Sequence, residues 1–442
     1  MASSKQMILG AQCTSYGASS SAWRHESAAT DRLTNSDSII ESVKKAEEGK
    51  FHFVFMADHP ALRDDIATAS PSSTIDPIVI ASQLVRETEK IGIVLTQSTT
   101  FNYPYTVARQ LKALDVLSNG RIGWNTVTTN DPRIAANYGE NVAPRHMRYA
   151  RAHEFIQTVQ ALWGSFGQDA MKMDKEAGVF ADTSEIEPVF AHGEYVSSRG
   201  PLPTPASPQG QPVIFQAGGG EEGLELAARY ASGVYSIASD IESGKLHRAQ
   251  LNLMAERLGK SAEQTHIFMG LLVTVGDTFE DALNKRRQML NDTVGGLEDK
   301  VMHLSQLVGI NLPYSMLHKP IPKEYLYMLE PHPYQLHSER AVELFKQGYT
   351  VFDVLAHGVT DFHRTIIGSP TEIADEMQTL FEAGACDGFT ISPDRYFDGL
   401  PDFVEKVIPE LQRRGLFHTE YEGQTLRDYL DVPYQYGVEK SL

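Results

Sequence analysis

Cysteine is nearly absent from this sequence, with only Cys13 and Cys386 in a chain of 442 residues. Two cysteines without CxxC spacing cannot form a disulfide framework, so we expect both to be buried free thiols. The 15 histidines include no HxH or HExxH arrangement, and we therefore expect no metal ion.

The sequence also lacks long hydrophobic runs and any excess of basic residues. No stretch of 18 or more apolar residues occurs, and residues 1–6 do not have the basic start or hydrophobic segment of a signal peptide. We therefore expect a cytoplasmic protein without a membrane partner. Acidic residues outnumber basic ones by 57 to 39, a net charge of −18, which argues against nucleic acid as a partner. A soluble acidic enzyme fits this composition.

A glycine-rich turn at residues 212–223 is the most informative local feature, because a short apolar run there ends in three glycines and then opens a helix. Glycines 218–220 allow a tight turn with no Cβ in the way of a ligand, and the free N–H groups at a helix start can bind phosphate. The spacing of Gly218, Gly220 and Gly223 also matches the dinucleotide-binding fingerprint GxGxxG. Asp240 lies about 20 residues further on, where an acid that binds the ribose is expected. Glu221 and Glu222 argue against a nicotinamide site, because they would repel a pyrophosphate. A glycine-rich turn without a ligand is the alternative.

Apolar strands alternate with helical patterns along the chain, which predicts an α/β protein with a parallel sheet. We expect strands at residues 7–13, 51–56, 91–97, 121–127, 213–215, 233–238, 265–275 and 388–392. Eight strand-then-helix units predict a closed (β/α)8 TIM barrel. Two segments, at about 167–211 and 291–365, are too long for ordinary connections and are expected to be insertions. We thus predict a single barrel domain over residues 1–442 with two excursions.

Polar or glycine residues follow four of the expected strands. In a (β/α)8 barrel the active site lies at the C-terminal ends of the strands. This criterion selects Asp58 and residues 96–100, 125–128 and 218–220. The convergence of four strand ends predicts a functional site at this face of the barrel.

Short segments spread from about residue 7 to residue 429 carry a resemblance to a known family. They are AWRH (22–25), VAR (107–109), GRIGWNTVT (120–128), RY (148–149), EF (154–155), HGE (192–194), RGPL (199–202), SPQG (207–210), QAG (216–218) and DGFTISP (387–393). They resemble the nitrilotriacetate and dibenzothiophene-sulfone monooxygenases, a branch of the bacterial-luciferase-like flavin barrels. The resemblance implies a two-component monooxygenase that takes reduced FMN from a separate NAD(P)H-dependent flavin reductase. Such an enzyme uses O2 to oxidise a small organic substrate through a flavin hydroperoxide, and a homo-oligomer is expected.

The resemblance also assigns a cofactor site. It places the flavin on Asp58, Thr96 and Asn125 near the ring system, on Tyr149, and on Gly219 and Gly220, and we add Ser98 and Arg145 as cofactor-binding candidates. Two positions depart from the family: Arg145 stands where relatives have histidine, and Gly220 where they often have a serine whose hydroxyl would bind the phosphate. A bidentate Arg145 can replace that contact with a charge-assisted one.

His25, in the AWRH segment, and His337, in the second insertion, are the candidate catalytic residues. Histidine titrates near neutral pH, so either could protonate or stabilise the peroxide or a substrate oxyanion. A surface or hydrogen-bonded structural histidine is the alternative for each.

Two other functions stay open at this point: a deazaflavin-dependent hydride-transfer oxidoreductase on the same barrel, and a non-catalytic flavin-binding protein. The substrate is not determined by the sequence. The resemblance offers sulfones or sulfides, aminopolycarboxylates, halogenated aromatics and flavins themselves.

Overall fold

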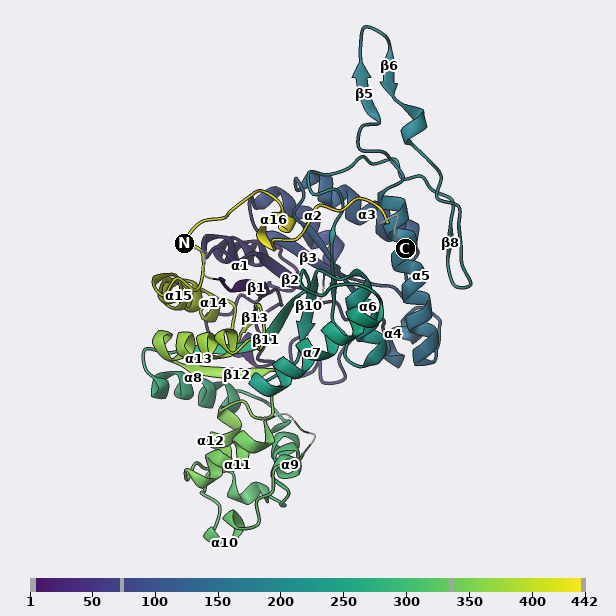
Figure 1. The fold of residues 1–442 in the computed structure, drawn as a ribbon. Helices are drawn as coiled ribbons and strands as arrows, with labels where there is room; N and C mark the ends of the chain where they lie inside the picture. The colour runs from purple at the N-terminus through teal and green to yellow at the C-terminus, as the bar shows by residue number, and fades with distance from the viewer. Residues whose placement is uncertain (1–4, 72–74, 334, 336, 439–442) are drawn as a thin grey trace.

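The centre of the protein is a closed barrel of parallel strands (Figure 1), seen in a computed structural model that describes residues 5–71, 75–333, 335 and 337–438. Its eight strands are β1 (Ile8–Gln12), β2 (Phe53–Met56), β3 (Gly92–Ser98), β4 (Ile122–Val127), β9 (Val213–Gln216), β10 (Gly233–Ser236), β11 (His266–Val275) and β13 (Gly388–Pro393). They pair in this order, and β13 closes the barrel on β1. The predicted (β/α)8 fold is confirmed.

Helices form the outer layer around this barrel (Figure 1). They are α1 (Asp37–Glu48), α2 (Pro77–Glu87), α3 (Pro104–Leu117), α4 (Pro132–Asn137), α5 (Arg145–Trp163), α6 (Glu221–Tyr230), α7 (Ile241–Arg257), α8 (Phe279–Asn291), α13 (Pro370–Glu382), α14 (Gly399–Asp402), the π-helical turn η4 (Phe403–Val407) and α15 (Ile408–Arg413). A further short helix, α16 (Leu426–Tyr429), packs against the N-terminal end of the barrel. Local sequence fixes several of their starts. At α2, for example, the Asp76 side chain accepts a hydrogen bond from the Ile78 N–H, and Pro77 opens the helix.

Strand β11 has three neighbours instead of two. One edge pairs with β13 over residues 268–273. The other edge pairs first with β10, over residues 266–269, and then with a further strand, β12 (Arg364–Gly368), over residues 271–275. We did not predict β12, because its apolar part is only Ile366 and Ile367, too short for a recognisable strand pattern.

The inner face of the barrel changes from apolar to polar along the strands. Its N-terminal end is filled by an apolar cluster of Ile8, Phe53, Phe55, Val94, Val213, Phe215 and Phe268, together with Leu426, Leu430 and Val432 from α16 and the residues after it. Side chains alternate between the two faces of a strand. The next inward positions are Gln12, Thr96, Asn125, Tyr235 and Thr390, which we call the polar ring. The polar ring therefore lies toward the C-terminal end, where barrels of this kind carry their sites.

Two segments extend beyond the barrel and its helices (Figure 1). Between α5 and β9 lie the projecting hairpin of β5 (Met171–Asp174) and β6 (Val179–Ala181), the turn η2 (Thr183–Glu185), and the pair β7 (Ala191–His192) and β8 (Ser197–Ser198). Between α8 and β12 lie α9 (Leu297–Val308), η3 (Tyr314–Met316), α10 (Lys323–Leu326), α11 (Ser338–Lys346) and α12 (Val351–Ala356), packed around a second apolar cluster. The grouping of the whole chain into one domain stays a prediction.

Both cysteines are free, and burial raises the pKa of the Cys386 thiol to about 12. Over the described ranges 5–71, 75–333, 335 and 337–438, the structure contains no helix with the length and apolar character needed to cross a bilayer.

Candidate active site

Thr96 and Asn125 lie side by side in the polar ring, because β3 and β4 pair with these two residues in register. The Asn125 amide donates a hydrogen bond to the Thr96 hydroxyl, with 2.8 Å between Nδ2 and Oγ1, and both side chains are buried. The remaining atom, Asn125 Oδ1, is buried and has no hydrogen-bond partner among the described residues. An unsatisfied buried acceptor costs about 1–3 kcal/mol. Asn125 therefore presents an acceptor that suits an N–H group of a ligand.

Asp58 and Ser98 lie at the ends of the neighbouring strands β2 and β3. Burial, and then the nearby Asp76 carboxylate, raise the pKa of Asp58 to about 6. Ser98 holds the chain after β3, because its hydroxyl bonds to the Thr129 hydroxyl at 2.8 Å and accepts from the Thr100 N–H at 3.1 Å. Asp58 and Ser98 thus lie at the C-terminal face of the barrel, where the sequence predicts a functional site.

The glycine turn connects β9 to α6 and leaves open space beside it. A Cβ at Gly219 would meet no atom within 4 Å, and Gly220 has a φ of +80°, which side chains rarely adopt. Helix α6 begins at Glu221, so the N–H groups of its first turn, which have no carbonyl partner within the helix, lie at this turn. At the end of β9, Gln216 Oε1 is buried without a partner among the described residues. The turn combines the N–H groups of a helix start, the buried Gln216 acceptor and room for a ligand.

The structure brings Arg145 and Tyr149 of α5 to this turn. The Arg145 guanidinium donates from Nη2 to the Gly219 carbonyl at 3.1 Å and pairs through Nε with Glu222 at 2.9 Å. It also lies over the Tyr149 ring, with 5.2 Å between Cζ and the ring centroid. A Cβ at Gly220 would come within 2.6 Å of Arg145 Nη2. Arg145 and Gly220, the two positions that depart from the family, are therefore linked. A serine side chain at position 220 would collide with the Arg145 guanidinium in its present position.

The two candidate catalytic histidines lie in different surroundings. His25 follows the short helix η1 (Ala22–Arg24), stacks on Phe397 with 5.0 Å between ring centroids, and accepts at Nδ1 from the Ser27 N–H at 3.2 Å. His337 precedes α11, and its Nε2 atom is buried with no partner among the described residues. Burial lowers the pKa of His337, and Arg364 lowers it further. A catalytic role for either histidine stays a prediction.

Tyr235, a member of the polar ring, forms a partly buried pair with His363 that the sequence did not predict. The Tyr235 hydroxyl lies 2.9 Å from His363 Nε2 and donates to Gln12 Oε1 at 3.3 Å. The alternation of inward and outward residues on β10 could have indicated Tyr235. His363 could not have been found, because it immediately precedes β12, a strand whose apolar part is too short to be recognised in the sequence.

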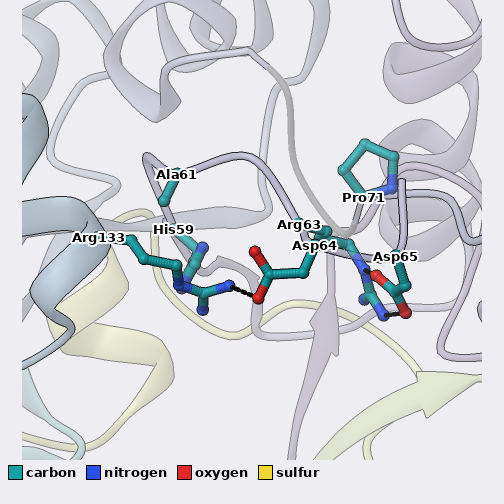
Figure 2. Close-up of a pocket in the computed structure, with 7 residues that line it drawn as sticks. All are labelled: His59, Ala61, Arg63, Asp64, Asp65, Pro71 and Arg133. Atoms are coloured by element: carbon teal, nitrogen blue, oxygen red, sulfur yellow. Dashed lines mark hydrogen bonds and ion pairs between the residues drawn. The ribbon is translucent and has the colours of Figure 1, made fainter. Parts of the chain in front are cut away.

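A surface pocket of about 470 Å³ lies next to the strand ends and is lined by His59, Ala61, Arg63, Asp64, Asp65, Pro71 and Arg133 (Figure 2). Its arginines are paired: Arg133 contacts Asp64 at 2.9 Å, and Arg63 contacts Asp65 at 2.7 Å (Figure 2). The pocket starts one residue after Asp58 but contains none of the flavin candidates. The pocket is therefore separate from the residues that the sequence predicts to bind the flavin.

Comparison with known proteins identifies the family. Residues 18–387 match the luciferase-like monooxygenase family. The chain belongs to this family.

Among its luciferase-like relatives, nitrilotriacetate monooxygenase component A of Aminobacter aminovorans is 36% identical over 98% of this chain and 98% of its own length. Dibenzothiophene-sulfone monooxygenase of Rhodococcus erythropolis is also 36% identical, over 93% of each chain. Among solved structures, EDTA monooxygenase from Chelativorans sp. BNC1 superimposes with a TM-score of 0.82 at 29% identity, covering 97% of this chain and 99% of its own. Riboflavin lyase with modified FMN and riboflavin gives 0.77 at 29% identity, over 96% of each chain.

These luciferase-like relatives confirm the resemblance seen in the sequence, and with it the prediction of a monooxygenase. The assignment of individual residues to flavin or substrate goes beyond them.

Proposed function

We propose that this protein is the oxygenase of a two-component system, which receives reduced FMN from a separate NAD(P)H:flavin reductase and uses O2 to oxidise a small organic substrate. The name of one relative, component A of nitrilotriacetate monooxygenase, supports a divided enzyme, and riboflavin lyase supports FMN as the flavin. The observation that carries the proposal is the unsatisfied Asn125 Oδ1, buried beside Thr96 at the C-terminal end of the barrel.

The residues at the strand ends fit reduced FMN. Asn125 Oδ1 and Gln216 Oε1 are buried acceptors that receive no hydrogen bond from the described part of the chain, and a flavin ring carries N–H groups that could satisfy such acceptors. The first turn of α6, the open space at Gly219 and the guanidinium of Arg145 suit a phosphate. When bound, reduced FMN would supply the activation of O2.

The remaining task of the chain is to orient this flavin and exclude water. The apolar cluster at the N-terminal end of the barrel, with Phe53, Phe215 and Phe268 at its centre, closes the floor below the polar ring. Closing off water strengthens each hydrogen bond made above that floor. No nucleophile is required for this chemistry, which agrees with a site made of amides, hydroxyls and backbone donors.

The test is a single-turnover assay with the purified chain and photoreduced FMN. The protein is mixed with O2 in the presence of dibenzothiophene sulfone, dimethyl sulfide, nitrilotriacetate, 2,4,6-trichlorophenol or riboflavin, and products are identified by mass spectrometry. We expect an oxygenated product from at least one compound, with 18O incorporated from 18O2. Flavin reoxidation without any such product would contradict the proposal. It would favour the deazaflavin enzyme or the flavin-binding protein, neither of which transfers an oxygen atom to a substrate.

Asn125→Ala tests the observation that carries the proposal. It removes the free acceptor and should weaken binding of reduced FMN about tenfold, near the lower end of the penalty for losing a buried hydrogen bond. Asn119→Ala, in the turn before β4, is the control and should leave binding unchanged. Equal affinity of both variants and the wild type would remove the support from this site.

A further inference from the structure

Tyr235 crosses the interior of the barrel from β10 to the opposite strands. Its ring packs on Phe55 of β2, with 5.3 Å between ring centroids, and its hydroxyl reaches Gln12 at the end of β1. A Cβ at Gly270 would come within 2.7 Å of this hydroxyl and 2.8 Å of His363 Nδ1. Because Gly270 has no side chain, the Tyr235 hydroxyl and the His363 ring can contact each other beside β11.

The phenol has one proton and two possible acceptors, Gln12 Oε1 and His363 Nε2. His363 Nδ1 is buried with no partner among the described residues. A proton on Nδ1 would bury an unpaired donor, whereas a proton on Nε2 leaves only a lone pair unpaired. The favoured tautomer of His363 therefore carries its proton on Nε2 and donates it to the Tyr235 oxygen, at 2.9 Å.

This arrangement points the Tyr235 proton away from His363. Its only described acceptor is Gln12 Oε1 at 3.3 Å, longer than the usual 2.5–3.0 Å of an O–H···O bond. A better placed acceptor on a ligand above the ring can take over this proton. Burial raises the pKa of the Tyr235 phenol above its ordinary value, and burial together with His337 lowers the pKa of His363 to about 4. At neutral pH both groups therefore stay uncharged, and Tyr235 remains a donor.

We propose that Tyr235 is a catalytic hydrogen-bond donor of this enzyme and that His363 is the residue that positions it. The inference rests on the proposed function. In that reaction, reduced FMN, O2 and substrate give FMN, the oxygenated substrate and water. One oxygen atom is transferred, and the other leaves as water with the two hydrogens of the flavin. The O–O bond breaks in this step, and the Tyr235 hydroxyl donates to the oxygen that departs.

Tyr235→Phe removes the hydroxyl and keeps the ring against Phe55. With the panel compound that the wild type oxidises, we expect the product per reduced FMN to fall at least tenfold, since a positioned proton donor contributes about 100-fold or more. The missing oxygen should appear as H2O2, while the affinity for reduced FMN and the thermal midpoint stay near those of the wild type. His363→Gln, whose amide can still donate to the phenol, should retain product formation that His363→Ala loses.

A matched control exists outside the barrel. Tyr230 on α6 bonds to His153 on α5, with 3.3 Å between its hydroxyl and Nδ1. Tyr230→Phe removes a phenol hydroxyl from an equivalent tyrosine–histidine pair and should leave product formation unchanged. A yield in Tyr235→Phe equal to that in Tyr230→Phe would overturn the inference.

A second measurement needs no flavin and no substrate. Nitrogen-15 NMR of histidine-labelled, flavin-free protein should show His363 protonated at Nε2, with a shift that changes in Tyr235→Phe. Protonation at Nδ1 would overturn the inference even if oxygenation is found. If the wild type oxidises nothing, the proposed function fails, and the NMR result still decides how Tyr235 and His363 share their protons.

Discussion

Replacement of Arg145 by alanine should weaken binding of the FMN phosphate selectively. Arg145 is the cation that contacts the glycine turn, through the Gly219 carbonyl, and it is paired with Glu222 at the start of α6. Loss of the guanidinium removes a charge-assisted contact and leaves Glu221 and Glu222 in the first turn without an opposing charge from Arg145. The phosphate should lose affinity for both reasons, and the flavin ring for neither.

The expected size follows from the surroundings of the side chain. A hydrogen bond to a charged group contributes about 1.5–3 kcal/mol. The Arg145 side chain is 50% exposed and already forms an ion pair with Glu222. Solvent screening and competition from Glu222 both reduce the free energy that Arg145 can contribute to phosphate binding. We therefore expect a loss of about 1.5 kcal/mol, roughly tenfold in the dissociation constant of reduced FMN. Glu222→Gln should act in the opposite direction, because it releases Arg145 for the phosphate.

Anaerobic fluorescence titrations of reduced FMN and reduced riboflavin into each variant measure this effect. Arg145→Ala should weaken FMN and leave riboflavin almost unchanged, and the difference should shrink at high salt. Arg229→Ala is the matched control, because Arg229 pairs with Glu225 at 2.8 Å further along α6. Equal losses for the two flavins, or no loss for either, would show that Arg145 does not hold the phosphate.

Three other outcomes are expected. The isolated chain should not oxidise NADH without added reductase, because the described residues form no second nucleotide-binding unit beside the barrel; rapid NADH oxidation in a spectrophotometric assay would contradict a two-component system. Light scattering should give a homo-oligomer, and a mass near the chain mass of 49.0 kDa would contradict it. Folding raises the pKa of Asp58 to about 6, so its ionisation opposes folding increasingly as the pH rises from about 4 to 6, and fully above 6. Asp58→Asn should therefore stabilise the flavin-free protein at pH 8, by about 1–2 kcal/mol after allowance for partial exposure, with a gain that shrinks toward pH 4 in urea denaturation. A gain independent of pH would refute this origin.

The barrel strands could be predicted because they are buried on both sides, which produces continuous apolar runs such as residues 51–56. Strand β12 could not, because its pairing with β11 depends on a partner almost 100 residues away. The sequence contains no local signal for that pairing.

Some contacts of the candidate site could also be predicted from the sequence, and others could not. Thr96 and Asn125 could be predicted from their positions at the ends of apolar strands, and their pairing follows from the order of the strands. The contact of Arg145 with the glycine turn was inferred only through a family resemblance, since α5 and α6 are separated by an insertion. The meeting of Tyr235 with His363 depends on the fold alone.

One edge of β11 pairs with a different strand at each of its ends. Near the N-terminal end β11 meets β10 directly, but toward the C-terminal end β12 occupies that edge. Strand β12 therefore supplies main-chain partners for residues 271–275 of β11, beyond the residues that pair with β10. The segment that ends in β12 also brings His363 to Tyr235. A change in the length of the α9–α12 segment therefore acts on the pairing of β11 and on the contact between Tyr235 and His363, whereas the β5–β6 hairpin forms a separate sheet.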